Sequence, residues 1–204
     1  MAIKFQYNKT SLQHLEKQLK MRVRSLPTIK SKESALRIEV KHTKDDVQKL
    51  ELRLEEEIFS YDSMLALWNE FRPDLISIND IAISTRKIAG VMIPILEDIE
   101  FEIEPYSLFN SPIWFADGII LLKHLARTGI ETEFARIKLE LLERARRKTT
   151  QKVNLFEKVQ IPGYLDAIRK IKRFMEDEES LSKSSQKIMR ANQEKRKIKE
   201  EEQE

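Results

Sequence analysis

Apolar residues recur every three or four positions through the first third of the chain. In a seven-residue repeat that begins at Leu12, the first and fourth positions are mostly apolar from about Thr10 to Phe71. A repeat of this kind predicts a long helix with one apolar stripe, the seam of a coiled coil. The apolar seam residues are Leu12, Leu15, Leu19, Leu26, Ile29, Leu36, Val40, Val47, Leu50, Leu54, Tyr61, Met64 and Trp68.

Several polar residues and one proline modify this first helix. The remaining seam positions are Arg22, Glu33, Thr43 and Glu57. Asn8 or Thr10 can cap the helix start, because a side-chain oxygen there accepts a backbone N–H. Pro27 removes one helical hydrogen bond. Since the repeat continues in the same register beyond Pro27, we expect a bend there rather than a break.

The middle of the chain changes to an alternation of apolar and polar residues. Residues 81–86 and 99–104 alternate in this way, and Ala89-Gly90 lies between the two runs. Alternation around a short glycine-containing turn predicts a small β-hairpin. Pro94 and the acidic row from Glu97 to Glu104 indicate exposed edges, since proline and charge discourage further strand pairing.

A second helical pattern starts near Ser111, with apolar residues at spacings of three or four as far as Met175. We expect Ile161-Pro162-Gly163 to interrupt this helix, because proline disrupts the hydrogen bonding of a helix interior. Beyond Ser180 the sequence is polar, and we expect the last ~15 residues to fray.

Two long helices that flank a short central region favour an antiparallel pair, because neither can bury its stripe alone. We therefore predict a mostly α fold, a long antiparallel two-helix coiled coil with a small central domain that contains the β-hairpin. The expected parts are a long N-terminal helix (1–72), the central domain (73–112), a long C-terminal helix (113–190) and a frayed charged tail (191–204).

Composition agrees with long helices. Charged residues make up 35% of the chain and aromatic residues 7%, with only four glycines. The absence of cysteine excludes disulfides and thiolate chemistry and fits a reducing compartment. We expect no signal peptide, and no apolar stretch approaches the length of ~20 residues that a membrane span needs. We therefore expect a protein that is soluble or peripheral to a membrane.

Charge is unevenly distributed along the chain. The net charge is +3, yet no lysine or arginine lies between Ile88 and Leu122, a stretch with six acidic residues. The middle therefore carries about −6 and the rest about +9. This contrast suggests different partners for the two parts, although ordinary charge variation on a solvated surface explains it equally well.

No motif for catalysis or cofactor binding is found. A glycine-rich phosphate loop cannot be built from Gly90, Gly118, Gly129 and Gly163. The three histidines are scattered and lack partners at metal-ligand spacing. Acidic runs on charged helices are normally solvated faces rather than catalytic pairs. We therefore predict a non-catalytic protein without a cofactor or a metal.

The segment Lys152–Pro162 resembles the R-V-N-A-L-E-x-V-x-I-P signature of the D subunit of the V-type and A-type ATPases. Its matching residues are Val153, Asn154, Glu157, Val159, Ile161 and Pro162. The segment 89–94, with Gly90 and Pro94, is similar to the family's N-V-x-G-V-x-V-P. Residues 26–36 are a weaker match to L-L-K-x-K-R-x-x-L. The chain departs from the signatures at Leu155, Phe156 and Glu33, and it lacks the asparagine of the turn.

This resemblance implies a non-catalytic central rotor shaft that couples ATP hydrolysis or synthesis to H⁺ or Na⁺ transport. It implies four kinds of partner: the catalytic A and regulatory B subunits of a hexamer, the F subunit, and the adaptor protein on the membrane ring. It implies neither nucleic-acid binding nor direct membrane insertion. We expect basic residues of both helices to contact the hexamer, namely Lys20, Arg22, Arg24, Arg144, Arg146, Arg147 and Lys148.

Two other functions remain open from the residues alone. A coiled-coil adaptor or scaffold outside any motor would explain the heptads and the lack of a catalytic site. A helical nucleic-acid-binding protein is supported only by the basic charge of the two arms, without interleaved aromatic residues or a recognition module.

Overall fold

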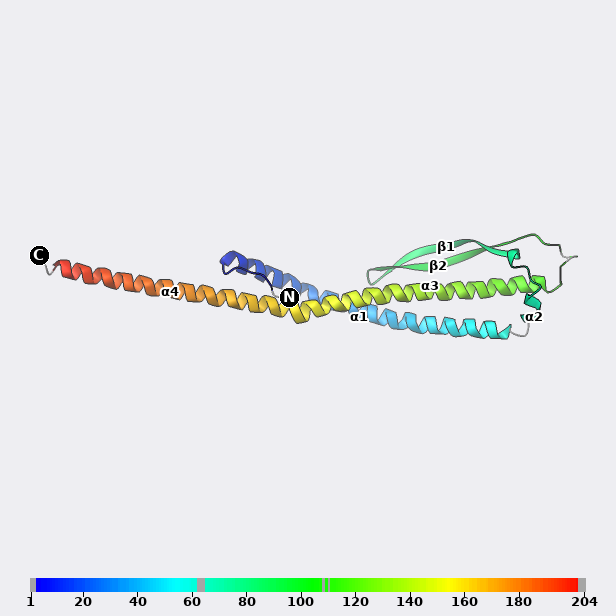
Figure 1. Cartoon of the computed structure of the whole chain (residues 1–204), viewed down its shortest axis with the longest axis horizontal. Helices are drawn as coiled ribbons and strands as arrows, with labels where there is room; N and C mark the ends of the chain where they lie inside the picture. The colour runs from blue at the N-terminus through cyan, green and yellow to red at the C-terminus, as the bar shows by residue number, and fades with distance from the viewer. Residues whose placement is uncertain (1–2, 62–64, 108, 110, 202–204) are drawn as a thin grey trace. The chain divides into compact units, whose positions relative to one another are not determined.

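The computed structural model describes residues 3–61, 65–107, 109 and 111–201. The protein is mostly helical with one two-stranded antiparallel sheet, as predicted (Figure 1). The elements are α1 (Lys9–Ser60), α2 (Leu65–Trp68), the 3₁₀ turn η2 (Pro73–Leu75), β1 (Ile76–Ile88), β2 (Val91–Ile103), α3 (Phe115–Asn154), the π-helical segment η3 (Leu155–Gln160) and α4 (Ile161–Glu201).

Helix α1 starts where the capping signal placed it. The Asn8 side-chain oxygen accepts the backbone N–H of Ser11 at 2.7 Å, which satisfies one of the free donors of the first turn. The helix continues through Pro27 without a break, as expected. It ends at Ser60 rather than near Phe71, because the last turn tightens: the Tyr61 N–H bonds the Ile58 carbonyl three residues back.

The predicted seam is the less exposed face of α1. Every seam position from Leu12 to Tyr61 is buried or half-buried, and most residues between these positions are exposed. Thr43, a polar seam residue, is only 1% exposed. Met64 lies outside the described residues. The position of the packed face is therefore confirmed, while supercoiling of the two helices stays a prediction.

The hairpin prediction is confirmed with its turn at Ala89-Gly90. Strands β1 and β2 pair antiparallel from Ile76↔Ile103 to Ile88↔Val91. Ala89 and Gly90 have φ values of +48° and +82°, so both adopt the left-handed region that a tight two-residue hairpin turn requires. Glycine adopts it freely, whereas an alanine there costs roughly 1–2 kcal/mol.

The expected interruption at Ile161-Pro162-Gly163 is wrong. Helix α3 passes into six π-helical residues and then into α4, without leaving helical structure. The N–H of Ile161 bonds the carbonyl of Phe156, five residues back instead of four. The wider turn accommodates Pro162, which has no N–H to donate and whose ring would clash with the carbonyl four residues earlier. Helix α4 extends to Glu201, into the tail where we expected fraying.

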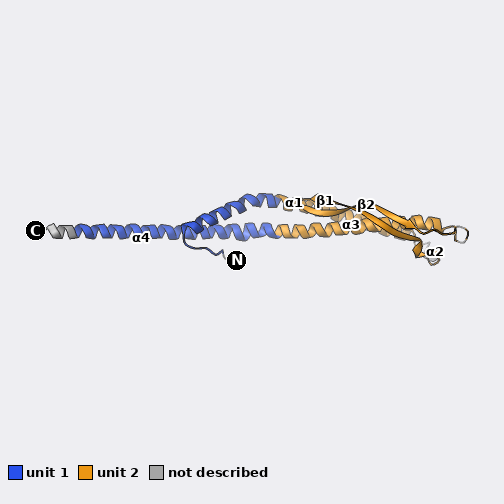
Figure 2. Cartoon of the chain, turned by 90° about the horizontal axis from the view of Figure 1, so that it is seen from above, with its two compact units in different colours: residues 1–30, 151–204 blue, residues 31–150 orange. Residues whose placement is uncertain are grey.

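The chain forms two compact units (Figure 2). Unit 1 comprises residues 1–30 and 151–204, and unit 2 comprises residues 31–150. The core of unit 1 joins Leu15 of α1 to Ala167, Ile168 and Ile171 of α4. The N-terminal Ile3 covers this core and approaches Gly163 so closely that a Cβ there would lie 3.1 Å from its Cδ1.

Unit 2 has its own core, in which the hairpin packs on both helices. Leu36 and Val40 of α1 and Leu142 of α3 meet Ile93 of β2. The turn residue Ala89 packs against the same cluster, so the tip of the hairpin is held on the helices. The turn end of the hairpin thus packs on the two helices, and packing against a helix stabilises a two-stranded sheet.

We predict that Leu142→Ala destabilises unit 2 by about 2–5 kcal/mol, because Leu142 is 0% exposed and its removal leaves a cavity among three elements. Urea denaturation followed by circular dichroism measures the change. Ile137→Ala, on the same helix but at a side chain 39% exposed, is the matched control and should cost less than about 1 kcal/mol. Equal losses in the two variants would contradict this description of the core.

Candidate partner-binding surface

The basic residues predicted to contact partners lie in both compact units. Lys20, Arg22 and Arg24 belong to unit 1, whereas the run from Arg144 to Lys148 belongs to unit 2. Lys20 and Arg24 are exposed on α1.

Arg22 is directed at the neighbouring helix. Its Nε donates to the Gln160 Oε1 at 2.7 Å, and a terminal nitrogen bonds the Gln18 carbonyl of its own helix at 3.1 Å. Its guanidinium lies 4.7 Å from the centroid of the Tyr164 ring, within cation–π range. Arg22 thus occupies a polar seam position by bonding η3 and stacking on α4, which leaves it half-buried inside unit 1.

The second group is also partly engaged within its unit. Arg147 pairs with Glu143 at 2.9 Å, one helical turn earlier, and Arg146 is half-buried. Arg144 and Lys148 are exposed. Close to Arg146, the pKa of Glu33 is held below its usual value, first by the hydrogen bond from Arg37.

Three of the residues that carry the family resemblance contact another element of the same unit. Glu157, in the π-helical segment, forms a 2.7 Å ion pair with Lys30, which lies in the weaker matched segment on α1. Gly90 forms the hairpin turn beside Lys32, and Pro94 pairs with Thr85 across the sheet. The other matching residues are Val153 and Ile161, both half-buried, and Asn154, Val159 and Pro162, all exposed.

Ion pairs join the helices of each unit in antiparallel order. In unit 1, Glu16 pairs with Lys172 and Lys30 with Glu157. In unit 2, Lys138 pairs with Glu39 and Arg136 with Glu51. Farther along the same two helices, the His124 imidazole lies 3.2 Å from the Glu57 carboxylate. Residue numbers increase along α1 in the direction in which they decrease along its partner helix. The two helices of each unit therefore run antiparallel.

Glu57 is the most enclosed acid of these pairs, with a side chain 14% exposed. It lies 2.8 Å from Arg53 and 3.2 Å from His124. Burial alone would raise its pKa, but the Arg53 hydrogen bond, the Thr128 hydroxyl and His124 outweigh burial and lower the pKa below 4.5.

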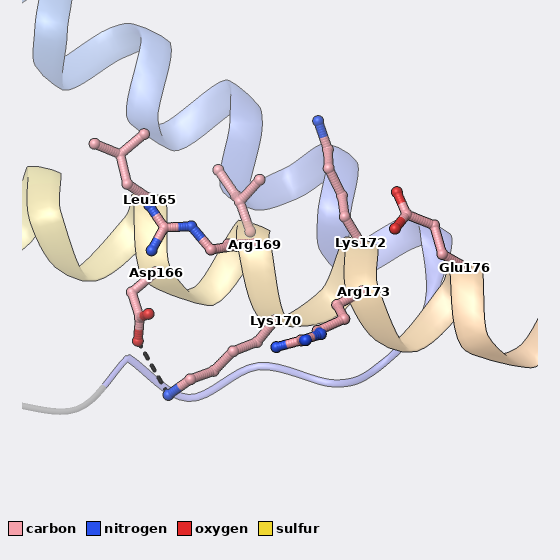
Figure 3. A pocket seen from close by; sticks show the side chains of 8 residues that line it. Leu165, Asp166, Arg169, Lys170, Lys172, Arg173 and Glu176 are labelled. Carbon is pink, nitrogen blue, oxygen red and sulfur yellow. Dashed lines mark ion pairs between the residues drawn. The ribbon is translucent and has the colours of Figure 1, made fainter.

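Sequence reasoning missed a basic cluster on α4. Arg169, Lys170, Lys172 and Arg173 line a shallow groove together with Leu165 and Glu176 (Figure 3). Lys170 is bound to Asp166 at 3.0 Å, the ion pair that Figure 3 marks. The signal in the sequence was four cations within the five residues 169–173.

Among the residues that the structure describes, no three acidic or histidine side chains lie close enough together to bind one metal ion. Over the same residues, no helix combines the length and apolar character that crossing a bilayer requires.

Comparison with known proteins assigns the family. A family model that describes the D subunit of ATP synthase matches residues 11–191. The chain belongs to this family. It is 31% identical over 179 residues to the V-type ATP synthase D subunit of Borreliella burgdorferi, and the alignment covers 87% of this chain and 89% of the relative.

Two further relatives of the same name agree. The V-type ATP synthase D subunits of Chlamydia pneumoniae and Chlamydia muridarum are each 29% identical, over 183 and 186 residues. These alignments cover 87% of this chain and 87% and 90% of the relatives, respectively. The family resemblance that the sequence motifs indicated is thus confirmed.

We predict that Arg22→Ala lowers the free energy of unfolding of unit 1 by about 1–3 kcal/mol, because a charged hydrogen bond and a cation–π contact are lost from a half-buried position. Thermal and urea denaturation measure the loss. Arg24→Ala, two residues away and exposed, should change stability by less than about 0.5 kcal/mol. An Arg22→Ala variant as stable as Arg24→Ala would show that the contact with Gln160 contributes nothing.

We predict that Glu57 contributes to the acid sensitivity of unit 2. Because its pKa is lower in the folded chain than the ordinary value of 4.5, its carboxylate stabilises the fold above that value. This stabilisation is lost as the pH falls through the lowered folded-state pKa. Urea denaturation from about pH 7 to about pH 3 should therefore show a smaller decline for Glu57→Gln than for the wild type. Identical declines would rule out this role.

Proposed function

We propose that this protein is the central-stalk rotor of a V/A-type rotary ATPase. Family membership over residues 11–191 carries the proposal. In this role the chain transmits torque between ATP hydrolysis or synthesis in a catalytic hexamer and H⁺ or Na⁺ transport through a membrane ring. The rotor itself is non-catalytic and needs no cofactor.

The packing inside each unit supports this mechanical role. A torque-bearing element must resist sliding and unwinding, and paired helices do so when apolar side chains interdigitate between them. Unit 1 supplies such packing through Leu15 and Ile171, and unit 2 through Leu36 and Leu142. The ion pairs add direction and register, although each exposed pair contributes little energy.

The proposed partners follow from the same role. The A and B subunits surround the shaft, while the F subunit and the adaptor protein of the membrane ring bind outside the hexamer. The complex lies in the cytoplasm, peripheral to the membrane. Among the predicted contacts, Lys20, Arg24, Arg144, Arg147 and Lys148 are exposed and suited to the hexamer. Arg22 and Arg146 are half-buried and suited to supporting roles.

Reconstitution with the A and B subunits encoded in the same genome tests the proposal. We expect this chain to co-purify with the hexamer and to change its rate of ATP hydrolysis at saturating ATP. A chain with Leu15→Asp and Ile171→Asp, which disrupts the core of unit 1, is the control that should do neither. Failure of the wild-type chain both to bind the hexamer and to alter its turnover would refute the proposal.

A further inference from the structure

Unit 1 carries a strong excess of positive charge in the region where α1 and α4 pair. Residues 3–30 and 151–175, which we call the basic band, contain 13 lysines and arginines but only three acidic residues. The band thus has a net charge of +10, although the whole chain carries only +3.

Internal pairing does not neutralise this charge. Each of the three acids already has a partner inside the band: Glu16 binds Lys172, Glu157 binds Lys30, and Asp166 binds Lys170. Among the residues that the structure describes, the other ten cations form no ion pair. They are Lys4, Lys9, Lys17, Lys20, Arg22, Arg24, Lys152, Lys158, Arg169 and Arg173.

Arg169 and Arg173 are the best placed of these cations to bind a partner. They lie one helical turn apart on α4 and line the groove of Figure 3, and both are exposed. Arg22, by contrast, is already bound to Gln160. A guanidinium binds a carboxylate through two parallel hydrogen bonds, so two of them one turn apart can bind two carboxylates.

The groove also has an apolar part and a negative end. Leu165 is half exposed at one end, where it can contact the aliphatic part of a partner's side chains. Glu176 lies at the other end and begins the acidic run Glu176–Glu179. A partner must therefore present carboxylates opposite Arg169 and Arg173 and keep them away from Glu176.

We propose that the basic band is a docking surface for an acidic protein surface of the hexamer, and that Arg169 and Arg173 bind its carboxylates. This inference rests on the proposed function and adds to it the chemistry of the contact. It also adds two residues that were not among the sequence-predicted contacts. A protein partner fits better than a nucleic acid because the chain belongs to a family of ATP synthase subunits.

Such a contact suits a surface that must bind and be released repeatedly. Complementary charge increases the association rate and sets orientation, while exposed ion pairs remain weak enough to exchange. Dissolved salt screens the attraction between exposed charges, most strongly when they are separated by more than a Debye length, about 8 Å at physiological ionic strength. The binding should therefore weaken as salt is added.

The test compares charge-reversal variants of the full chain in binding to the reconstituted hexamer of A and B subunits. We expect Arg169→Glu with Arg173→Glu to weaken binding about 10- to 100-fold at physiological salt and to flatten its salt dependence. Lys41→Glu with Lys44→Glu makes the same charge change at two exposed positions of unit 2. This control should weaken binding less than about threefold.

Two further measurements distinguish the loss of a charged contact from a loss of helical structure. Arg169→Lys with Arg173→Lys keeps the charge but loses the paired hydrogen bonds, so it should weaken binding less than the charge reversal does but more than the control does. Circular dichroism checks that all variants keep their helicity. If the wild type binds the hexamer but the reversal at Arg169 and Arg173 weakens it no more than the control does, the docking proposal is wrong while the rotor proposal stands. If the wild type does not bind the hexamer, the rotor proposal itself fails.

Other polyanions provide the last comparison. A DNA duplex of about 20 base pairs and vesicles that contain anionic phospholipid are tested at the same salt concentration. We expect both to bind the wild-type chain more weakly than the hexamer does. Tighter binding to either of them would overturn the assignment of an acidic protein surface.

Discussion

The fold depends on one constraint: each long helix has an apolar stripe that it cannot bury by itself. A single helix in water leaves such a stripe exposed, and most helical stability in proteins comes from packing that stripe against a partner. Here the partner is supplied by the same chain. Leu15 packs with Ile168 and Ile171 in the core of unit 1, and Leu36 packs with Leu142 in the core of unit 2.

Polar residues within the stripe adapt to this packing in different ways. Thr43 is almost fully buried, whereas Arg22 extends along the contact to reach Gln160 and the Tyr164 ring. Burial alone would raise the pKa of Glu57, but its contacts, first of them the Arg53 hydrogen bond, lower it. The packed face therefore continues through positions where the sequence is not apolar.

Local sequence signals predicted much of this structure. The seven-residue repeat identified the packed face of α1, Asn8 marked its start, and the Ala89-Gly90 turn located the hairpin. These features depend on neighbours within a few residues, which is why a single sequence reveals them. Hydrophobic period and turn chemistry are local properties of the sequence.

Features that depend on distant residues could not be predicted in the same way. The docking of Ile93 on Leu36 and Leu142 joins three segments that are far apart in sequence. Pro162 predicted an interruption of the helix, but the structure contains a π-helical turn there instead. Arg22 was expected to face a partner, and only the position of Gln160 shows why it turns inward.

We propose that this chain turns inside a catalytic hexamer. Because the chain contains no cysteine, Glu97→Cys on the exposed part of the hairpin gives a unique attachment point for an optical probe. With the hexamer fixed to a surface and ATP added, we expect the probe to rotate continuously in one direction. A probe that stays stationary while the same complexes hydrolyse ATP would contradict this claim.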